Sequence, residues 1–483
     1  MTRTRILAVA AAVVASVVLL RAAAAQAPAR GSAQAFAAPD WTAVDAELLR
    51  HFQALIRIDT QDPPGNETKA VEYIKQVLEA DGIPVTVAAK DPARANAIAR
   101  IKGNGSKRPV LLMGHTDTVK VDPSKWKFPP FSATRDGGYV YGRGVLDNKW
   151  QVAANMETLL LLKRHNVALD RDVIFVAEAG EEAATGPGIE YLVNERWNDI
   201  DAEYCIAEAG EVVRRGGQLR YAMTETAEKQ PKGARLVARG PSGHGSRPLR
   251  SSAILHLAQA IEKIALWDPP MRLNDTTRTY FTMLASIAPA EDAARYKALL
   301  DAAKAAAARA YLAEHEPMHY SMLHTSISPN IVSGGFQSNV IPSEAEATLD
   351  IRALPDENIE AFYDQMRRVI NDPAVTLVPN TANSRPGAAP SRIDTDVYRA
   401  IEAANRKVYN VPTLPYMQTG ATDMAFLRAK GMQCYGVSLA TDEEDTLKGF
   451  AAHSDQERVL EDSLYRYLQF QWEVLSATAF ARR

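Results

Sequence analysis

The stretch that decides the fold runs from Val110 to Lys149 and reads VLLMGHTDTVKVDPSKWKFPPFSATRDGGYVYGRGVLDNK. It opens with an uninterrupted apolar run, Val110–Met113, which is typical of a buried strand in a mostly parallel sheet. His115 and Asp117 follow this strand, and Asp147 comes later in a Gly-rich turn. In an open α/β sheet, reactive side chains gather where strands end in loops at the carboxyl edge. These residues therefore indicate the first half of a metal site.

Helices and strands alternate around this stretch, which is the pattern of an α/β layered domain. The apolar spacing predicts helices over Glu67–Asp81 and Lys149–His165, and apolar runs predict strands over Val173–Ala177 and Tyr204–Ala207. With 483 residues the chain exceeds a single comfortable core, so we expect two domains.

The pattern changes from about residue 230. Residues Glu344–Arg352 alternate between apolar and polar, as expected for a sheet with helices on one face only. The stretch Pro379–Pro390 reads as a hinge back to the first domain. We therefore predict a catalytic domain in two parts, 26–229 and 382–483. It is interrupted by a smaller α+β lid at 230–381 that carries a helical insertion at about 269–329.

The first 25 residues are predicted to be a secretory signal peptide. Arg3 and Arg5 precede the uncharged run Ile6–Leu20, and the small residues Ala23–Ala25 follow it. The alternative is an uncleaved anchor, although the run is short for a membrane span. We expect an exported protein, periplasmic or secreted, with no stable membrane span after the signal is removed.

The charge balance does not favour nucleic acid as a partner, because the formal net charge is -3 with no basic excess. The two cysteines, Cys205 and Cys434, lie in apolar strand-like runs and are expected to be buried thiols.

The second half of the metal site is expected from side chains that also follow strands or Gly-rich turns. Imidazole nitrogens and carboxylate oxygens are the ligands that zinc and similar divalent metals prefer. The resulting ligand set suits two metals that share a carboxylate better than one metal with an open position. It consists of His115, Asp147, Glu182, Glu208 and His453.

The adjacent pair Glu181 and Glu182 adds a second indication. Neighbouring carboxylates at a strand end point in different directions, so one can bind metal while the other acts as the general base on water. Asp117 suits a supporting role in which it orients the imidazole of His115.

A series of motifs in one order carries a family resemblance: GHTDTV, GRGVLDNK, AEAGEE, IAEAG, SGHGSRP, SNVIPSEAEATLDIRALP, TGATD and GFAAHSD. The chain resembles the dizinc peptidase and aminoacylase family that includes carboxypeptidase G, Gly-Xaa carboxypeptidase, succinyl-diaminopimelate desuccinylase and N-acyl amino-acid amidases. The resemblance covers roughly residues 45 to 480. It implies a zinc-binding three-layer α/β/α catalytic domain interrupted by an α+β lid through which members form homodimers.

The resemblance also implies roles for individual residues. Asp147 would be the carboxylate shared by two Zn²⁺ ions, for which Co²⁺ or Mn²⁺ can substitute. His115 and Glu208 would hold one ion, and Glu182 and His453 the other. Glu181 would be the general base and Asp117 the partner of His115. In the lid, His244 would stabilise the tetrahedral intermediate, in many members from the partner subunit. The substrate carboxylate would be held by Asn339, Arg352 and the backbone of Gly420.

Two departures from the family pattern are visible. The family usually shows Asp-Asp-Lys-Gly where this chain has Asp147, Asn148, Lys149 and Trp150, and it often shows an acidic residue where Gly180 stands. Asp147 is kept, so metal binding is still expected, while Trp150 is expected to reshape the wall of the cleft.

The expected activity is hydrolysis of an amide bond next to a free carboxylate in a small peptide, as in a carboxypeptidase or dipeptidase. The alternative within the same class is an N-acyl amino-acid amidohydrolase. Trp126, Phe128 and Phe131 are candidates to line an apolar pocket for either substrate. An alternative from another class is a non-catalytic peptide-binding relative, which would be expected to have lost ligands or the base.

Overall fold

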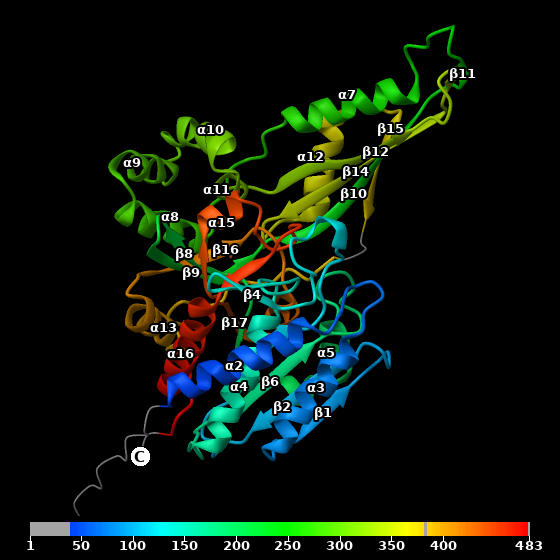
Figure 1. Ribbon diagram of the computed structural model, residues 1–483. Coiled ribbons are helices and arrows are strands. Elements are labelled where there is room, and N and C mark those ends of the chain that lie inside the picture. The colour runs from blue at the N-terminus through cyan, green and yellow to red at the C-terminus, as the bar shows by residue number, and fades with distance from the viewer. Residues whose placement is uncertain (1–38, 381–383, 482–483) are drawn as a thin grey trace, which may run out of the picture. The chain divides into compact units, whose positions relative to one another are not determined.

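The computed structural model describes residues 39–380 and 384–481 (Figure 1). The predicted signal peptide, residues 1–25, and most of the segment that follows it lie outside the described residues. Among the described residues, no helix has the length and apolar character needed to cross a membrane.

The larger sheet has ten strands, and its centre is parallel, as predicted. The outer strands β1, β2, β8 and β9 pair antiparallel, whereas β18 and β16 pair parallel with β8 and β9. In spatial order the strands are β1 (Val85–Ala88), β2 (Asn96–Ile101), β6 (Val173–Glu178), β3 (Val110–His115), β7 (Tyr204–Ala207), β17 (Gln433–Gly436), β9 (Gln218–Glu228), β8 (Glu211–Arg215) and β18 (Ala440–Asp442), with β16 (Thr413–Gln418) beside β9.

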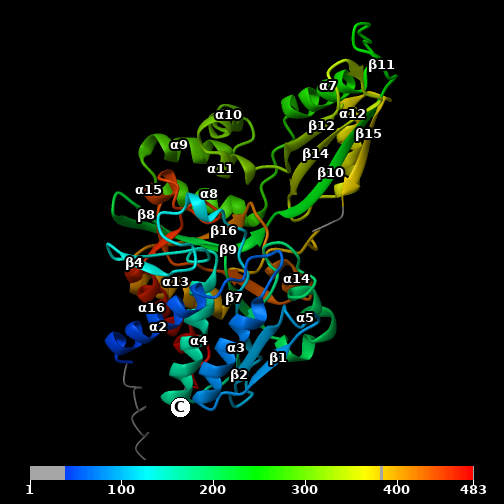
Figure 2. The same cartoon turned by 45° about the vertical axis from the view of Figure 1, so that its right-hand side comes forward.

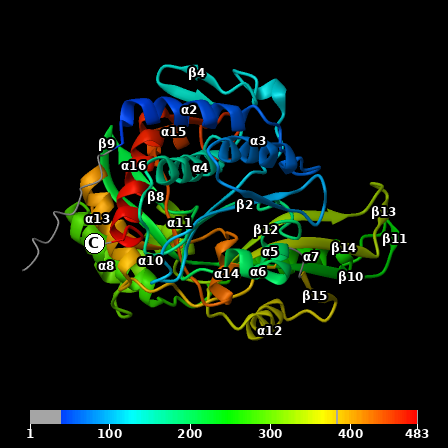
Figure 3. The same ribbon diagram turned by 90° about the horizontal axis from the view of Figure 1, so that it is seen from below.

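Helices cover both faces of the central strands, which gives three layers. Successive residues of β3 point to opposite faces: Val110 and Leu112 pack with one helix layer, and Leu111 and Met113 with the other. Figure 3 shows α2, α3 and α4 on one side and α5, α6 and α14 on the other. The first layer consists of α2 (Trp41–Ile56), α3 (Glu67–Ala80), α4 (Lys149–Arg164), α13 (Asp396–Ala404) and α16 (Glu461–Thr478); the second consists of α5 (Ile189–Glu195), α6 (Trp197–Ile200) and α14 (Met424–Ala429).

The second main sheet is antiparallel and four-stranded, with α7 (Ala253–Leu266) and α12 (Ile359–Ile370) packed on one face (Figure 2). Its order is β12 (Ser326–Gly334), β14 (Glu344–Ala353), β10 (Gln230–Arg239) and β15 (Val375–Asn380). Along β14 the burial alternates at every residue, as the sequence predicts. A short ladder joins β11 (Gly243–His244) to β13 (Val340–Ile341).

The remaining elements are short. A three-stranded sheet contains β4 (Thr134–Asp136), β5 (Tyr139–Tyr141) and β19 (Arg458–Leu460); η1 (Pro123–Lys125), η2 (Asn405–Tyr409) and α15 (Glu443–Leu447) complete the chain. The C-terminal helix α16 begins at Glu461, because the residues before it form β19 and pair with β5.

The helical insertion packs on the large sheet and not on the four-stranded one. Its helices are α8 (Asp275–Ile287), α9 (Ala290–Leu299), α10 (Ala305–His315) and α11 (Pro317–Ser321). Tyr280 and Phe281 of α8 share a buried cluster with Leu414 and Tyr416 of β16. The insertion thus supplies the apolar cover for β9 and β16, which is a role the sequence did not reveal.

Lys229 lies between β9 and β10, where the chain passes from one sheet to the other. Its side chain is fully buried, and Nζ donates to Ser321 O (3.0 Å), Ser321 Oγ (3.1 Å) and Ser326 Oγ (2.8 Å). Burial lowers the pKa of Lys229 to about 7. The end of the insertion therefore satisfies the donor groups of a buried amine at the junction of the two sheets.

Candidate metal centre

Most of the predicted ligands lie at or just after the ends of three neighbouring parallel strands. Strand β3 ends at His115, Glu182 follows the end of β6, and Glu208 comes directly after β7. Because β6, β3 and β7 are adjacent and parallel, their carboxyl ends meet at one edge of the sheet. Asp147 precedes α4, and His453 lies in a loop before β19 with a positive φ of 62°.

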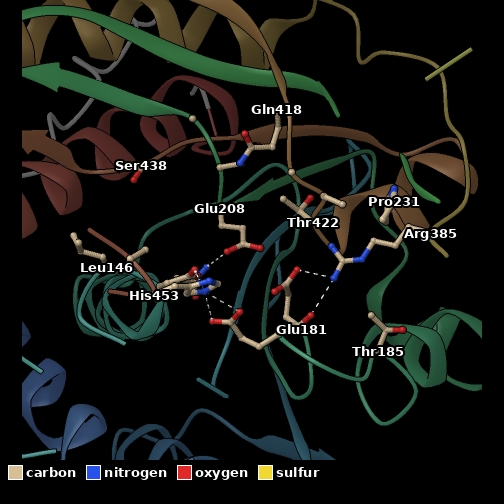
Figure 4. A pocket seen from close by; sticks show the side chains of 18 of the residues that line it. Leu146, Glu181, Thr185, Glu208, Pro231, Arg385, Gln418, Thr422, Ser438 and His453 are labelled. Carbon is tan, nitrogen blue, oxygen red and sulfur yellow. Dashed lines mark hydrogen bonds and ion pairs between the residues drawn. The ribbon is translucent and has the colours of Figure 1, made fainter. Parts of the chain in front are cut away.

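Asp147 lies between the two predicted halves of the site. Its Oδ1 is 3.0 Å from His115 Nε2, and its Oδ2 is 3.0 Å from His453 Nε2. Glu208 Oε2 completes the first group at 3.4 Å from His115 Nε2, and Glu182 Oε2 completes the second at 3.0 Å from His453 Nε2. Figure 4 shows Glu208 and His453 directed toward the same small volume. The structure therefore brings all of the predicted ligands together.

The donor set fits a pair of divalent cations. His115, Asp147 and Glu208 place one ligand atom each within 4.8 Å of one another, and so do Asp147, Glu182 and His453. Burial, reinforced by the Asp147 carboxylate, raises the pKa of Glu182 to about 7, and the imidazoles of His453 and His115 oppose this rise. Imidazole nitrogens and a shared carboxylate are the groups from which two-metal sites are built.

Asp117 holds the loop that carries the two glutamates. Its carboxylate oxygens accept the backbone N–H groups of Glu181 (3.2 Å) and Glu182 (3.0 Å), and Oδ1 lies 3.4 Å from His115 Nδ1. The side chain is fully buried. Asp117 therefore orients both the imidazole of His115 and the loop after β6, which is a larger role than the sequence predicts.

Glu181 has a buried partner that the sequence does not indicate. Arg385 Nη2 donates to Glu181 Oε1 (2.7 Å) and to the Glu181 carbonyl oxygen (3.0 Å), and it lies 3.2 Å from Asp423 Oδ1. Figure 4 shows the guanidinium directed at the Glu181 carboxylate. Burial and the Glu208 carboxylate raise the pKa of Glu181 well above its usual range, and Arg385 opposes this. Arg385 lies in a Pro- and Gly-rich segment without the apolar periodicity of a helix or strand, so the sequence does not indicate its position.

A cavity of about 560 Å³ opens onto these groups. Its lining includes the predicted base Glu181, the predicted substrate-binding residues Arg352 and Gly420, and the missed residue Arg385. The guanidinium of Arg352 pairs with Asp350 at 2.9 Å and remains about one-third exposed. Trp126, Phe128 and Phe131, predicted as pocket residues, do not line this cavity.

A sequence model of Peptidase family M20/M25/M40 matches residues 111–476 of the chain. The chain belongs to this family. Its members are hydrolytic enzymes, so the chain is an M20 hydrolase of the peptidase and aminoacylase type.

Curated relatives and solved structures agree with this assignment. The human N-fatty-acyl-amino acid synthase/hydrolase PM20D1 is 25% identical over 66% of this chain, although the match spans only 64% of that protein. Mouse aminoacylase-1 is 24% identical over 89% of this chain and 94% of its own length. The fold matches an M20 family metallo-carboxypeptidase from Sulfolobus solfataricus, with a TM-score of 0.68, 19% identity, and coverage of 89% of this chain and 99% of that one. It also matches the Bacillus subtilis YXEP protein, described as a dinuclear metal-binding peptidase, with a TM-score of 0.58, 15% identity, and coverage of 90% and 98%.

The departures of this M20 chain from the family motif have visible structural roles. Asn148 Nδ2 donates to Glu208 Oε2 (2.8 Å), and its Oδ1 accepts the backbone N–H of His115 (3.2 Å). An amide can make both contacts, because it carries a donor and an acceptor. Trp150 is buried in the first turn of α4. Its ring packs edge-to-face on the ring of Tyr467, with 4.5 Å between the two ring centroids. Trp150 also lines the cavity, as predicted. Gly180 has a φ of 78°, and a Cβ there would lie 2.3 Å from Ala184 O.

His244 and Asn339 are not among the residues that line the cavity. Both are exposed, and His244 Nδ1 accepts hydrogen bonds from the backbone N–H (3.1 Å) and the hydroxyl (2.8 Å) of Ser246. Pro231 lines the cavity at one end of β10, whereas His244 follows the other end at Arg239. At about 3.3 Å per residue, β10 separates these two places by roughly 25 Å. The structure of one chain does not bring His244 and Asn339 to the metal ligands.

We predict that Asp117→Asn weakens metal binding by about 10- to 100-fold, because an amide cannot accept both backbone N–H groups and also face the imidazole of His115. The dissociation constants would be measured by competition with a chelator of known affinity. Asp136→Asn is the matched control, since Asp136 is an exposed partner of Lys127. Equal metal affinity in the two variants would contradict the role assigned to Asp117.

Proposed function

We propose that this M20 hydrolase is an exported dizinc enzyme that cleaves an amide bond next to a free carboxylate, as a carboxypeptidase or dipeptidase does. The observation that carries the proposal is that one cavity is lined by four of the five metal-ligand candidates, by Glu181 and by Arg352. The imidazole and carboxylate donors suit zinc, and the residue order of positions 1–25 supports export.

In this proposal, two bound zinc ions would supply Lewis acidity toward the scissile carbonyl and toward water. Glu181 takes a proton from the attacking water and later donates it to the leaving amine. Its raised pKa makes the carboxylate a stronger base, and such tuning is typical of general acid–base catalysts. Arg385 positions the Glu181 side chain through its 2.7 Å contact, and its positive charge opposes the rise in the pKa of this carboxyl.

We predict that Glu181→Gln retains its metals but loses activity by about 10²- to 10⁴-fold, because the amide cannot accept the proton. Metal content would be measured by elemental analysis and turnover with the best substrate found. Glu182→Gln is the contrasting variant, since it should lose both metal and activity. Substantial turnover by Glu181→Gln would refute the assignment of the base.

The proposed substrate class follows from the positive charge of Arg352, which lines the cavity. Arg352 extends from the polar face of β14, and a planar guanidinium binds a carboxylate through two parallel hydrogen bonds. Its only ion-pair partner among the described residues is Asp350, on the same strand, which leaves donor groups for a ligand. Gly420 also lines the cavity.

The test is hydrolysis of a substrate panel by the zinc-loaded protein with and without chelator. Dipeptides and N-blocked dipeptides are expected to be cleaved in a chelator-sensitive manner, and C-terminally amidated forms poorly. Arg352→Gln should raise KM for the free acids and leave the amidated forms unchanged, because only the former lose a charged partner. Equal loss on both kinds of substrate would contradict carboxylate recognition by Arg352.

A second candidate function, N-acyl amino-acid hydrolysis, is favoured by a neighbouring cavity of about 220 Å³. It shares Leu146, Gly210, Ser438 and Ala452 with the main cavity, and Leu439 and Phe450 add apolar surface. An apolar acyl group or side chain fits such walls. Cleavage of N-acyl amino acids alone in the same panel would establish this candidate instead.

The proposed role of His244 requires a second copy of the chain. On the four-stranded sheet, β12 is an edge strand that exposes Ile331 and Val332, each 62% accessible. Exposed apolar edge strands favour pairing with another strand. We therefore include homodimerisation through this lid sheet in the proposal, with His244 and Asn339 reaching the partner's cavity.

We predict that two inactive variants complement each other when mixed and allowed to exchange subunits. Glu181→Gln supplies an intact His244, and His244→Asn supplies an intact Glu181, so each mixed dimer regains one complete site. An equal mixture should reach about a quarter of the wild-type rate per chain, because half of the dimers are mixed and each has one working site. A rate equal to the sum of the rates of the two variants measured separately would rule out a site shared between subunits.

A further inference from the structure

A second cluster of metal-ligating side chains lies between helices α2 and α4. Glu47 and His51 are four residues apart on α2, so they lie on one face of the helix, and Glu157 faces them from α4. One ligand atom of each lies within 4.8 Å of the others. Glu157 follows the first residue of α4, Lys149, by eight residues, which is roughly 12 Å along a helix axis. The cluster is therefore separate from the centre around Asp147.

Glu157 is an acidic side chain with no partner. It is fully buried, and neither carboxylate oxygen has a hydrogen-bond partner among the described residues. Burial raises the pKa of Glu157 to about 8, and the nearby Glu47 carboxylate adds to this. A buried carboxyl without a hydrogen bond is costly, and such groups in native proteins usually have a partner.

His51 presents a free ring nitrogen to the same place. Its Nδ1 lies 2.7 Å from the hydroxyl of Tyr73 on α3, while its buried Nε2 has no hydrogen-bond partner and lies 3.5 Å from Glu47 Oε1. Burial lowers the pKa of His51, which favours the neutral imidazole that binds metals. A partner on Nδ1 that fixes the ring and leaves Nε2 open is the usual arrangement around a metal-binding histidine.

We propose that Glu47, His51 and Glu157 bind one divalent cation of the zinc class, in addition to the catalytic pair. One imidazole and two carboxylates are a suitable ligand set for this class of cation. The cation replaces the proton of Glu157 and becomes the missing partner of both Glu157 and His51 Nε2. Glu47 remains shared, because Arg164 Nη1 (2.7 Å) and Arg50 Nη2 (3.2 Å) also contact its carboxylate, which can accept more than one partner.

The site would be structural, since the cavity above the catalytic pair contains none of its members. Its ligands come from α2 and α4, and the tyrosine that orients His51 comes from α3. A cation there links three helices of one layer through side chains alone.

The test compares the zinc content of the full chain and its variants after loading with Zn²⁺ and removal of unbound metal. Wild type should retain one equivalent more per chain than Glu157→Gln or His51→Gln, and both variants should keep wild-type kcat. Glutamine matches the shape of the protonated Glu157, so this variant is expected to fold. Asp81→Asn is the matched control: Asp81 is the other carboxylate bound by Arg164, and its loss should leave the zinc content unchanged.

A second measurement needs no variant. Crystals of the zinc-loaded wild type should give an anomalous scattering peak between α2 and α4, apart from those at Asp147. Equal zinc content in wild type and both variants, or no peak at this place, would overturn the proposal and leave Glu157 as a buried protonated acid.

Discussion

The arrangement of the candidate metal centre depends on the carboxylate of Asp147. Its two oxygens face the Nε2 atoms of His115 and His453, each at 3.0 Å, and no other side chain belongs to both ligand groups around it. The two histidines come from segments more than three hundred residues apart in sequence, one at the end of β3 and the other before β19. Bringing them to one carboxylate requires the late strands and α16 to complete the domain begun by the first part of the chain. The four-stranded sheet consists of residues that lie, in the sequence, between these two parts of the chain.

Much of the site follows from local rules that a sequence displays. A buried apolar run followed at once by a polar residue places that residue at a strand end, and adjacent parallel strands bring such ends together. His115, Glu182 and Glu208 were predictable for this reason, and Asp147 and His453 were predictable from the Gly-rich turns that precede them. The alternation along β14 likewise predicted which face of that strand carries Arg352.

Other features depend on contacts that a local pattern does not contain. Arg385 reaches Glu181 from a segment without periodicity, so only the folded chain shows the pair. Asn148 was visible as a departure, but its double contact to Glu208 and His115 needs the turn geometry before α4. The Ala-rich helices between β11 and β12 could be predicted as helices, whereas the surface they cover could not, because amphipathic spacing does not specify a partner. In the sequence nothing distinguishes Glu157 from an exposed helical glutamate, because only the structure shows that it is buried.

The buried amine of Lys229 limits how helices α8 to α11 could be removed from this chain. Helices α8 to α11 look like a self-contained addition that could be excised between the strands on either side. Yet the acceptors around Lys229 come from Ser321 at the end of α11 and from Ser326 at the start of β12. Excision would remove both acceptors of Ser321 and leave this fully buried amine with Ser326 Oγ, and it would uncover β9 and β16 as well. The addition is therefore not modular: a version of this enzyme without it would also need a different residue at position 229 and a new apolar cover for two strands.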